Sequence, residues 1–164
     1  MGIFNKILRA LSLDTAFYEE IEKDTEATGE AFIVVVIGGV CSGIGLTGIL
    51  GVRAAIAGLV SGVIGWFIWS LVIFLIGVKV FKHTSDLGEL LRTLGFAYSP
   101  SVFALLGLIP KVGTAIYTIT TIWYLLAFIV AVRQSLDCET GRAIFISLMG
   151  FIVYWCFRIA LLLV

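Results

Sequence analysis

The side chains that could carry out catalysis are few in this sequence and lie far apart. There is one histidine, His83, and the three cysteines form no CxxC pair. Zinc sites and disulfide frameworks need cysteine and histidine residues at characteristic short spacings. Among the acids, Asp86 and Glu89 fit the polar face of a surface helix better than a catalytic pair. The sequence therefore predicts no enzyme, no metal site and no cofactor.

Polar side chains inside apolar runs are a second source of chemistry, and Arg158 is the clearest example. It follows Ser147, Gly150 and Tyr154 along one predicted helix face, in steps of three and four residues. A charge inside a membrane span is a functional candidate by default. However, Arg158 lies only six residues before Val164, about 9 Å along a helix, so its side chain could instead reach the lipid headgroups. Both interpretations remain open.

The stretch RTLGFAYSP, residues 92–100, joins a polar segment to an apolar run. Upstream, Thr84 or Ser85 is placed to cap the helix that leads into it. Pro100 has no backbone N–H, and it frees the carbonyl of Phe96. Within a membrane such a break is tolerated only when nearby groups satisfy the freed carbonyl, and three hydroxyl side chains are available here. The candidate polar site comprises Gly95, Phe96, Tyr98, Ser99, Pro100, Ser101, Thr118, Tyr154 and Arg158.

The elements that must position these residues are membrane-spanning helices. Hydrophobic residues make up 60% and charged residues 13% of the 164 positions, against about 45–50% and about 25% in soluble domains. A span needs about 20 apolar residues, and it should be helical because lipid offers backbone groups no partner. The fold class is thus an all-α integral membrane protein with five transmembrane helices, the third kinked at Pro100. The predicted spans are residues 31–51, 55–80, 90–109, 113–132 and 143–164.

The N-terminal segment, residues 1–30, differs from the membrane domain, residues 31–164, in its polarity. Residues 3–11 place apolar side chains at helical spacing and predict an amphipathic helix lying in the headgroup layer. Asp14 can cap a second short helix, which is acidic. The acids that follow are either a solvated linker that seats the first span or a docking surface for a cytoplasmic partner.

The placement of lysine and arginine predicts the orientation in the membrane. Eight of these residues lie at one side of the predicted spans, two (Arg53 and Lys111) at the other, and Arg158 within the last span. All eleven acids fall on the side of the eight. We therefore expect a cytoplasmic N-terminus and a C-terminus on the opposite side. The net charge of zero favours no nucleic-acid partner.

Small residues recur every four positions in the first two spans. Gly39, Gly43 and Gly51 share one face of the first span. Gly58 and Gly62 follow the same period in the second span. Small residues at this period let helix backbones approach closely, so we expect the two stripes to pack together across a short loop. A pore lined by these glycines is the alternative.

The run LLRTLGFAYSPSVFALLGLIPKVG, residues 90–113, resembles the signature of the Yip domain family. Members of that family resemble one another in an acidic cytoplasmic N-terminus, five membrane helices and a Gly-Tyr-x-x-x-Pro element that opens the third span. Gly95 and Pro100 match this element, while Phe96 stands where tyrosine is usual. The turn IPKVG and the tryptophan of the fourth span also match.

The resemblance implies a membrane-embedded adaptor. Eukaryotic members bind small Rab-type GTPases and partner Yip proteins in secretory membranes. This chain has a shorter N-terminal region, and its opening NKILRALSLDTAFYEEIEKD resembles prokaryotic members. We therefore do not transfer Rab binding to it, and we expect an integral protein of a prokaryotic cytoplasmic membrane.

Two functions of different classes remain open. The first is a non-enzymatic scaffold, adaptor or accessory subunit of a membrane complex. Its partners would be the lipid bilayer, other membrane proteins or further copies of this chain. The second is a small transporter, channel or lipid-handling protein that uses the broken third span and Arg158. Broken helices often bound substrate sites in transporters, although five spans do not divide into a simple inverted repeat.

Overall fold

The computed structural model describes residues 1–163, except for the side chains of Ile49, Arg158 and residues 161–163. Every regular element within these residues is a helix. In chain order the elements are α1 (Ile3–Leu11), α2 (Thr15–Lys23), α3 (Ala27–Leu50), α4 (Arg53–Phe74), the π-helix η1 (Leu75–Val80), α5 (Leu87–Ala97), the 3₁₀-helix η2 (Ser99–Leu108), α6 (Gly113–Ser135) and α7 (Thr140–Leu163).

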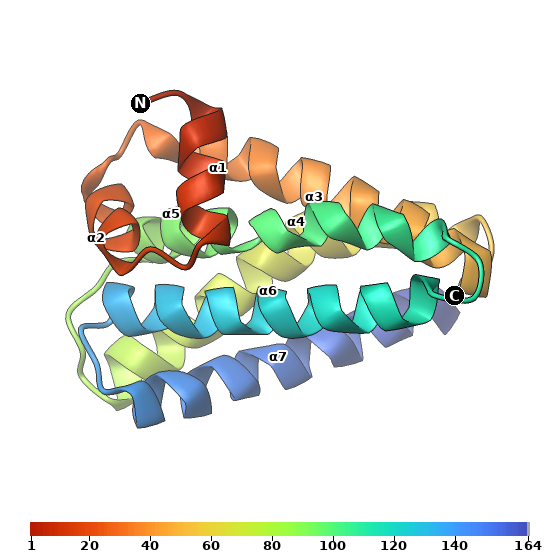
Figure 1. Cartoon of the computed structure of the whole chain (residues 1–164). Coiled ribbons are helices and arrows are strands. Elements are labelled where there is room, and N and C mark those ends of the chain that lie inside the picture. Colours follow the sequence, from red (N-terminus) through yellow and green to blue (C-terminus); the bar gives the residue numbers. More distant parts are fainter. Residues whose placement is uncertain (164) are drawn as a thin grey trace.

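Five helical segments of the described chain are long and apolar enough to cross a membrane. They are α3, α4 with η1, α5 with η2, α6 and α7. Figure 1 shows α1 and α2 at one end of the resulting bundle and the end of α7 near the other. The helical character and the number of spans agree with the predicted fold class. Boundaries shift by a few residues, since α3 begins at Ala27 rather than Ala31.

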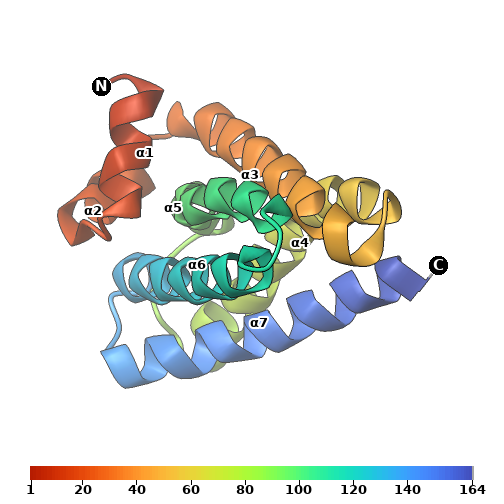
Figure 2. The same cartoon turned by 45° about the vertical axis from the view of Figure 1, so that its right-hand side comes forward.

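The α3–α4 hairpin brings two backbones into direct contact (Figure 2). A Cβ atom added at Gly43 would lie 2.7 Å from Ala55 O and 3.0 Å from Gly58 Cα. One added at Gly39 would lie 3.3 Å from Gly62 Cα. The glycines of the two stripes therefore face each other, and no larger side chain fits between the helices.

Gly51 does not belong to this interface, which corrects the packing role that its spacing suggested. Its φ is +74°, and no atom lies within 4 Å of a Cβ built there. It ends α3 instead, with its N–H bonded to Thr47 O at 2.9 Å, because glycine adopts a positive φ without strain. Two glycines outside the stripe pack tightly: Gly38 against the Tyr98 ring, and Gly45 against the η2 backbone.

The third span begins with a capping box and changes helix type along its length. Asp86 Oδ1 accepts from Glu89 N at 2.9 Å, and Asp86 N donates to Glu89 Oε2 at 3.0 Å. The cap is therefore Asp86 rather than Thr84 or Ser85, because its carboxylate reaches the third helical N–H. The α-helix ends at Ala97, and the chain continues as the 3₁₀-helix η2.

Helices α1 and α2, here termed the N-terminal cap (residues 3–23), pack against α5 and α6. Phe17 of α2 is fully buried, and its ring meets that of Phe96 edge-on with centroids 5.4 Å apart. Asp14 caps α2 as predicted, with Oδ1 accepting from Phe17 N at 3.3 Å. The cap thus shares one hydrophobic core with the membrane helices.

Candidate functional site

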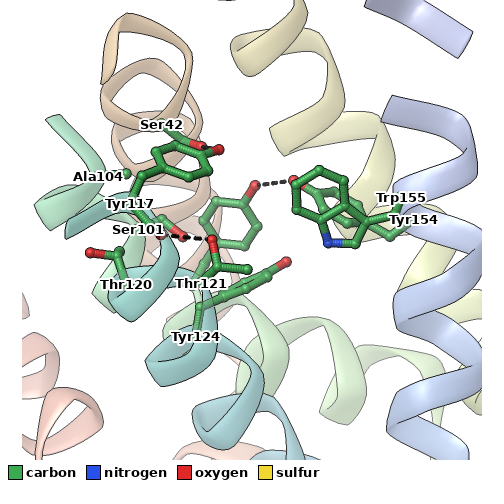
Figure 3. Close-up of a pocket in the computed structure, with 10 residues that line it drawn as sticks. Ser42, Ser101, Ala104, Tyr117, Thr120, Thr121, Tyr124, Tyr154 and Trp155 are labelled. Carbon is green, nitrogen blue, oxygen red and sulfur yellow. Dashed lines mark hydrogen bonds between the residues drawn. The ribbon is translucent and has the colours of Figure 1, made fainter. Parts of the chain in front are cut away.

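A polar cavity, here termed the hydroxyl cavity, lies inside the bundle where α5 gives way to η2 (Figure 3). The residues that line it come from α3, α6, α7 and the third span, and eight of the ten carry a hydroxyl group. The space inside is about 20 Å³, which is room for one water molecule. The lining residues are Ser42, Tyr98, Ser101, Ala104, Tyr117, Thr120, Thr121, Tyr124, Tyr154 and Trp155.

The break beside this cavity satisfies its own backbone. Pro100 removes the donor that Phe96 O would have in a continuous α-helix. Ser99 Oγ donates to that carbonyl at 2.6 Å. The Ser99 side chain is buried, so this hydrogen bond meets the requirement that lipid imposes on a broken helix.

Tyr98 connects the break to the last membrane helix. Its hydroxyl lies 3.1 Å from that of Tyr154, at hydrogen-bonding distance. The Tyr98 ring meets Tyr124 edge-on, with centroids 5.0 Å apart. Behind them, Trp69 stacks on Tyr154 at 5.4 Å and on Phe128 at 4.1 Å. Aromatic packing therefore fixes one wall of the cavity.

The opposite wall joins α3 to α6. Ser42 Oγ lies 3.0 Å from Tyr117 OH, again at hydrogen-bonding distance. Thr121 Oγ1 donates to Tyr117 O at 2.9 Å, within its own helix. Together the two walls connect all five spans through hydroxyl and aromatic groups.

The residues of the polar site predicted from the sequence lie in different parts of the structure. Tyr98, Ser101 and Tyr154 line the cavity. Phe96, Ser99 and Pro100 form the break beside it.

Three other predicted residues lie elsewhere or cannot be placed. Gly95 packs against α3, since a Cβ there would lie 2.7 Å from Ala31 Cβ. Thr118 is exposed, and its Oγ1 donates to Thr114 O at 2.9 Å, so it lies outside the cavity. The side chain of Arg158 is outside the described part of the structure.

Several lining residues were missed because the sequence marks them weakly. On α6 the buried face carries Tyr117, Thr120 and Tyr124, which are three and four residues apart. This helical spacing could have separated Thr120 from Thr118. Ser42 stands alone in a glycine-rich span, and no pattern in the sequence distinguishes it.

The chemistry available in the cavity is hydrogen bonding and aromatic stacking. None of its ten lining residues is an acid, a histidine, a lysine or a cysteine, so these side chains include no acid–base pair at neutral pH. Within residues 1–163 as described, no three His, Cys, Asp or Glu side chains are grouped to hold a metal.

A second polar site, here termed the acidic cleft, lies at the cap end of the bundle and measures about 290 Å³. Burial raises the pKa of Glu22 above its ordinary value; the charge of Lys23 opposes this rise, and the charges of Asp137 and Glu89 add to it. The lining residues are Glu22, Thr84, Ser85, Asp86, Glu89, Ser135 and Asp137.

Arg92 fixes the position of α2 beside this cleft. Although the sequence places Arg92 at the membrane edge, its side chain is buried. Its Nε donates to Glu22 O at 3.1 Å, and its Nη2 donates to the same oxygen. A guanidinium group can make such a paired contact, whereas a lysine ammonium cannot.

Ion pairs complete the attachment of the cap. Lys6 of α1 bonds to Asp24, at 3.2 Å, and to Glu30. Burial alone would lower the pKa of Lys6, but the two carboxylates outweigh it and raise that pKa. Arg9 bonds to Asp14 and to Glu20, at 2.6 Å each. These bonds lower the pKa of both carboxyl groups.

The fold and the two polar sites define an integral membrane protein whose buried polar groups connect helices to one another. A family model for the Yip1 domain matches residues 11–161, from the end of α1 into α7. The chain belongs to the Yip1 domain family, which confirms the resemblance seen in the third span. No curated protein and no solved structure matches the chain.

Proposed function

We propose that this protein is a membrane-embedded adaptor, which acts without catalysis as a scaffold or accessory subunit of a membrane complex. The observation that carries the proposal is the composite nature of the acidic cleft. Glu22 comes from α2, Asp86 and Glu89 from the start of α5, and Asp137 from the α6–α7 turn. A partner would therefore meet one folded surface, and a segment rich in lysine and arginine has the complementary charge.

The attachment of the cap supports this role. Arg92 holds the Glu22 carbonyl, while Trp123 Nε1 donates to Leu11 O at 3.2 Å. Gln134 Nε2 donates to Glu19 Oε1 at 2.7 Å. These contacts fix both cap helices on the bundle, so the cleft is preformed and a partner need not order it.

The proposal includes an orientation with the cap in the cytoplasm, a bend of the third span at Pro100, and α1 in the headgroup layer. Phe4 and Leu8 of α1 are 68% and 47% exposed, while Lys6 is only 7% exposed. An outward apolar face suits the boundary of headgroups and acyl chains better than water. The prokaryotic cytoplasmic membrane remains the expected location.

Site-specific photo-crosslinking in native membranes tests the adaptor role. A photoreactive residue at Asp137, which is exposed beside the cleft, should capture a protein partner. The same residue at Val112, exposed at the opposite end, should not. Arg92→Ala should reduce capture at position 137, because the cap no longer completes the cleft. No capture at position 137, or equal capture at both positions, would count against the adaptor.

The orientation has its own test. Cys138 is buried and is a poor reporter, so Asp137→Cys should be introduced into a cysteine-free background. An impermeant maleimide applied to intact cells should label Lys111→Cys and leave Asp137→Cys unlabelled. The reverse pattern would invert the topology.

The transporter or lipid-handling alternative rests on the hydroxyl cavity and Arg158. A space of about 20 Å³ admits water but no organic substrate, and this favours the adaptor. Proton and lipid flux across liposomes decides between the two. Flux that is abolished by Tyr98→Phe would establish the transporter or lipid-handling function. The adaptor role predicts no flux.

A further inference from the structure

The hydroxyl cavity is framed by backbone contacts that prevent it from closing. On one side α3 already touches η2, because a Cβ atom built at Gly45 would clash with the Ala104 carbonyl. A Cβ atom built at Gly38 would lie 2.6 Å from the Tyr98 ring and 3.2 Å from Ser101 Cβ. The two helices therefore cannot move closer together to remove the space between the lining side chains.

Aromatic rings fix the other side of the cavity. Tyr124 and Tyr154 line it and are 5% and 3% exposed. The Tyr124 ring packs edge-on against Phe128, with centroids 4.6 Å apart, and the Tyr154 ring stacks on Trp69 at 5.4 Å. Phe128 and Trp69 are themselves fully buried. Rings in such a close-packed cluster cannot turn to fill the cavity, so the space persists.

The lining of the cavity selects a polar occupant. Thr121 Oγ1 donates to Tyr117 O at 2.9 Å, and a hydroxyl oxygen that donates one bond keeps lone pairs that can accept others. Ser42 and Ser101, both buried, bring further hydroxyl groups from α3 and η2 to the same space. An apolar group placed here would offer these oxygens no hydrogen bond.

The size and the charge of the cavity restrict the occupant to water. The space of about 20 Å³ exceeds the roughly 10–15 Å³ that one water molecule needs, and it is too small for an organic molecule. None of the ten lining side chains is a carboxylate, so a bare cation would find no opposite charge to offset the loss of its hydration.

We propose that the hydroxyl cavity binds one ordered water molecule, which bonds to hydroxyl groups from at least two of the helices around it. A buried water typically makes about three hydrogen bonds, and polar cavities of this size hold water whereas apolar ones stay dry. The water helps to hold the broken third span against its neighbours by hydrogen bonds. This site goes beyond the adaptor role and does not depend on the acidic cleft.

The test is hydroxyl-radical footprinting of the full chain in nanodiscs. An X-ray pulse ionises water wherever it lies, and mass spectrometry identifies the side chains that are oxidised beside it. Tyr124 and Tyr154 should be oxidised although they are buried. Tyr18 is the internal control, because it is fully buried and lies outside the cavity, and it should stay unmodified. Equal protection of the three tyrosines would overturn the proposal.

Filling the cavity should displace the water. Ala104 lines the cavity, so Ala104→Val should lower the oxidation of Tyr124 and Tyr154 several-fold. Ala115→Val, at an exposed position of α6, is the matched control and should leave it unchanged. A variant that failed to fold would instead show oxidation of Tyr18.

A second variant keeps the shape of the cavity and removes one of its hydroxyl groups. Thr121→Val should also lower the oxidation of Tyr154. Thr118→Val is its control, because the Thr118 hydroxyl makes the same kind of bond within α6 but lies outside the cavity. Oxidation that persists in both Ala104→Val and Thr121→Val, with Tyr18 still protected, would overturn the proposal. The readout involves no protein partner, so its outcome is independent of the adaptor test.

Discussion

The α3–α4 interface and the interface between the N-terminal cap and α5 hold helices together by different means. Between α3 and α4, Gly43 and Gly58 bring backbone against backbone, and the described contacts at these glycines involve no ion pair. Between the cap and α5, Phe17 packs on Phe96 and Arg92 donates twice to the Glu22 carbonyl. The α3–α4 interface is therefore built from glycines, whereas the interface between the cap and α5 is built from large aromatic and charged residues.

The difference reflects the solvent that each interface excludes. Inside a membrane, an apolar side chain gains little by leaving lipid, so helices associate through close backbone contact. At the cap, docking removes the Phe17 ring of α2 from water, and the hydrophobic effect stabilises the contact. Different kinds of substitution should therefore destabilise the two interfaces.

The largest effect is expected from Gly58→Leu. A Cβ at this position would come within 3 Å of the Gly43 backbone and of Gly39 O, so α3 and α4 must separate. Overpacking typically costs about 1–3 kcal/mol, and leucine should reach or exceed the upper end. Unfolding by a denaturing detergent would measure the loss. Gly48→Leu is the matched control, because the nearest atom to its Cβ is 4.0 Å away. Equal destabilisation by both variants would refute the backbone-contact interpretation.

Arg92→Ala should weaken the cap and spare the membrane hairpin. It removes both hydrogen bonds to the Glu22 carbonyl, and a bond to a charged group contributes about 1.5–3 kcal/mol. Hydrogen exchange in α2 should accelerate, while exchange in α3 and α4 should not change. Arg92→Lys should recover only part of the loss, because it lacks the planar fork. Arg133→Ala, an exposed position on α6, serves as the neutral reference.

Ser99→Ala should have a smaller effect, confined to the third span. It deprives Phe96 O of its hydroxyl donor, at a cost of about 1 kcal/mol. The matched control is Thr118→Ala, since the Thr118 hydroxyl bonds only within α6 and is exposed. Thermal unfolding in bicelles would compare them. If Thr118→Ala were as harmful as Ser99→Ala, the break would not need its hydroxyl.

Acid should loosen the cap slightly, and this is the smallest expected effect. The folded pKa values of Asp14, Glu20 and Asp24 are lowered by their partners. Their contribution is therefore present above the ordinary carboxyl pKa, about 4, and is lost as pH falls below it. Glu22, whose folded pKa is raised by burial, works in the opposite direction, so protonating it favours the docked cap. Hydrogen exchange in α1, measured between about pH 6 and about pH 3, would show whether the loss of the ion pairs outweighs the protonation of Glu22.

Removing one partner tests whether these ion pairs cause the acid response. Arg9→Gln abolishes the bonds to Asp14 and Glu20 and should reduce the pH dependence of exchange in α1. An unchanged response in this variant would assign it to other groups.

Sequence reasoning succeeded where the cause is local or compositional. The five apolar helices follow from runs of about 20 apolar residues, and the cap of α2 follows from Asp14 at the right position. The sequence-based prediction was wrong where several nearby residues could fill the same role. Asp86 rather than Ser85 caps α5, and the difference depends on which side chain reaches a backbone N–H. Gly51 shared the spacing of the packing glycines, but the chain leaves the helix there.

The candidate site was only partly predictable for the same reason. Pro100 marks the break in the sequence, and the nearby hydroxyls suggest how it is satisfied. That Ser42 and Thr120 share a cavity with Tyr98 depends on the rotation of α3 and α6 about their axes. Every face of a membrane helix is largely apolar, so hydropathy alone does not fix that rotation.

The sequence by itself determined that lipid surrounds the helices, how many apolar helices there are and which family the chain belongs to, because these depend on composition and on a short motif. Only the tertiary structure decided that the cap is anchored by Arg92, that Tyr98 meets Tyr154, and that hydroxyl groups from separate helices line one cavity. These contacts join residues that are 56 to 70 positions apart or come from separate helices. Their geometry depends on how the helices pack around one another, which no local pattern encodes.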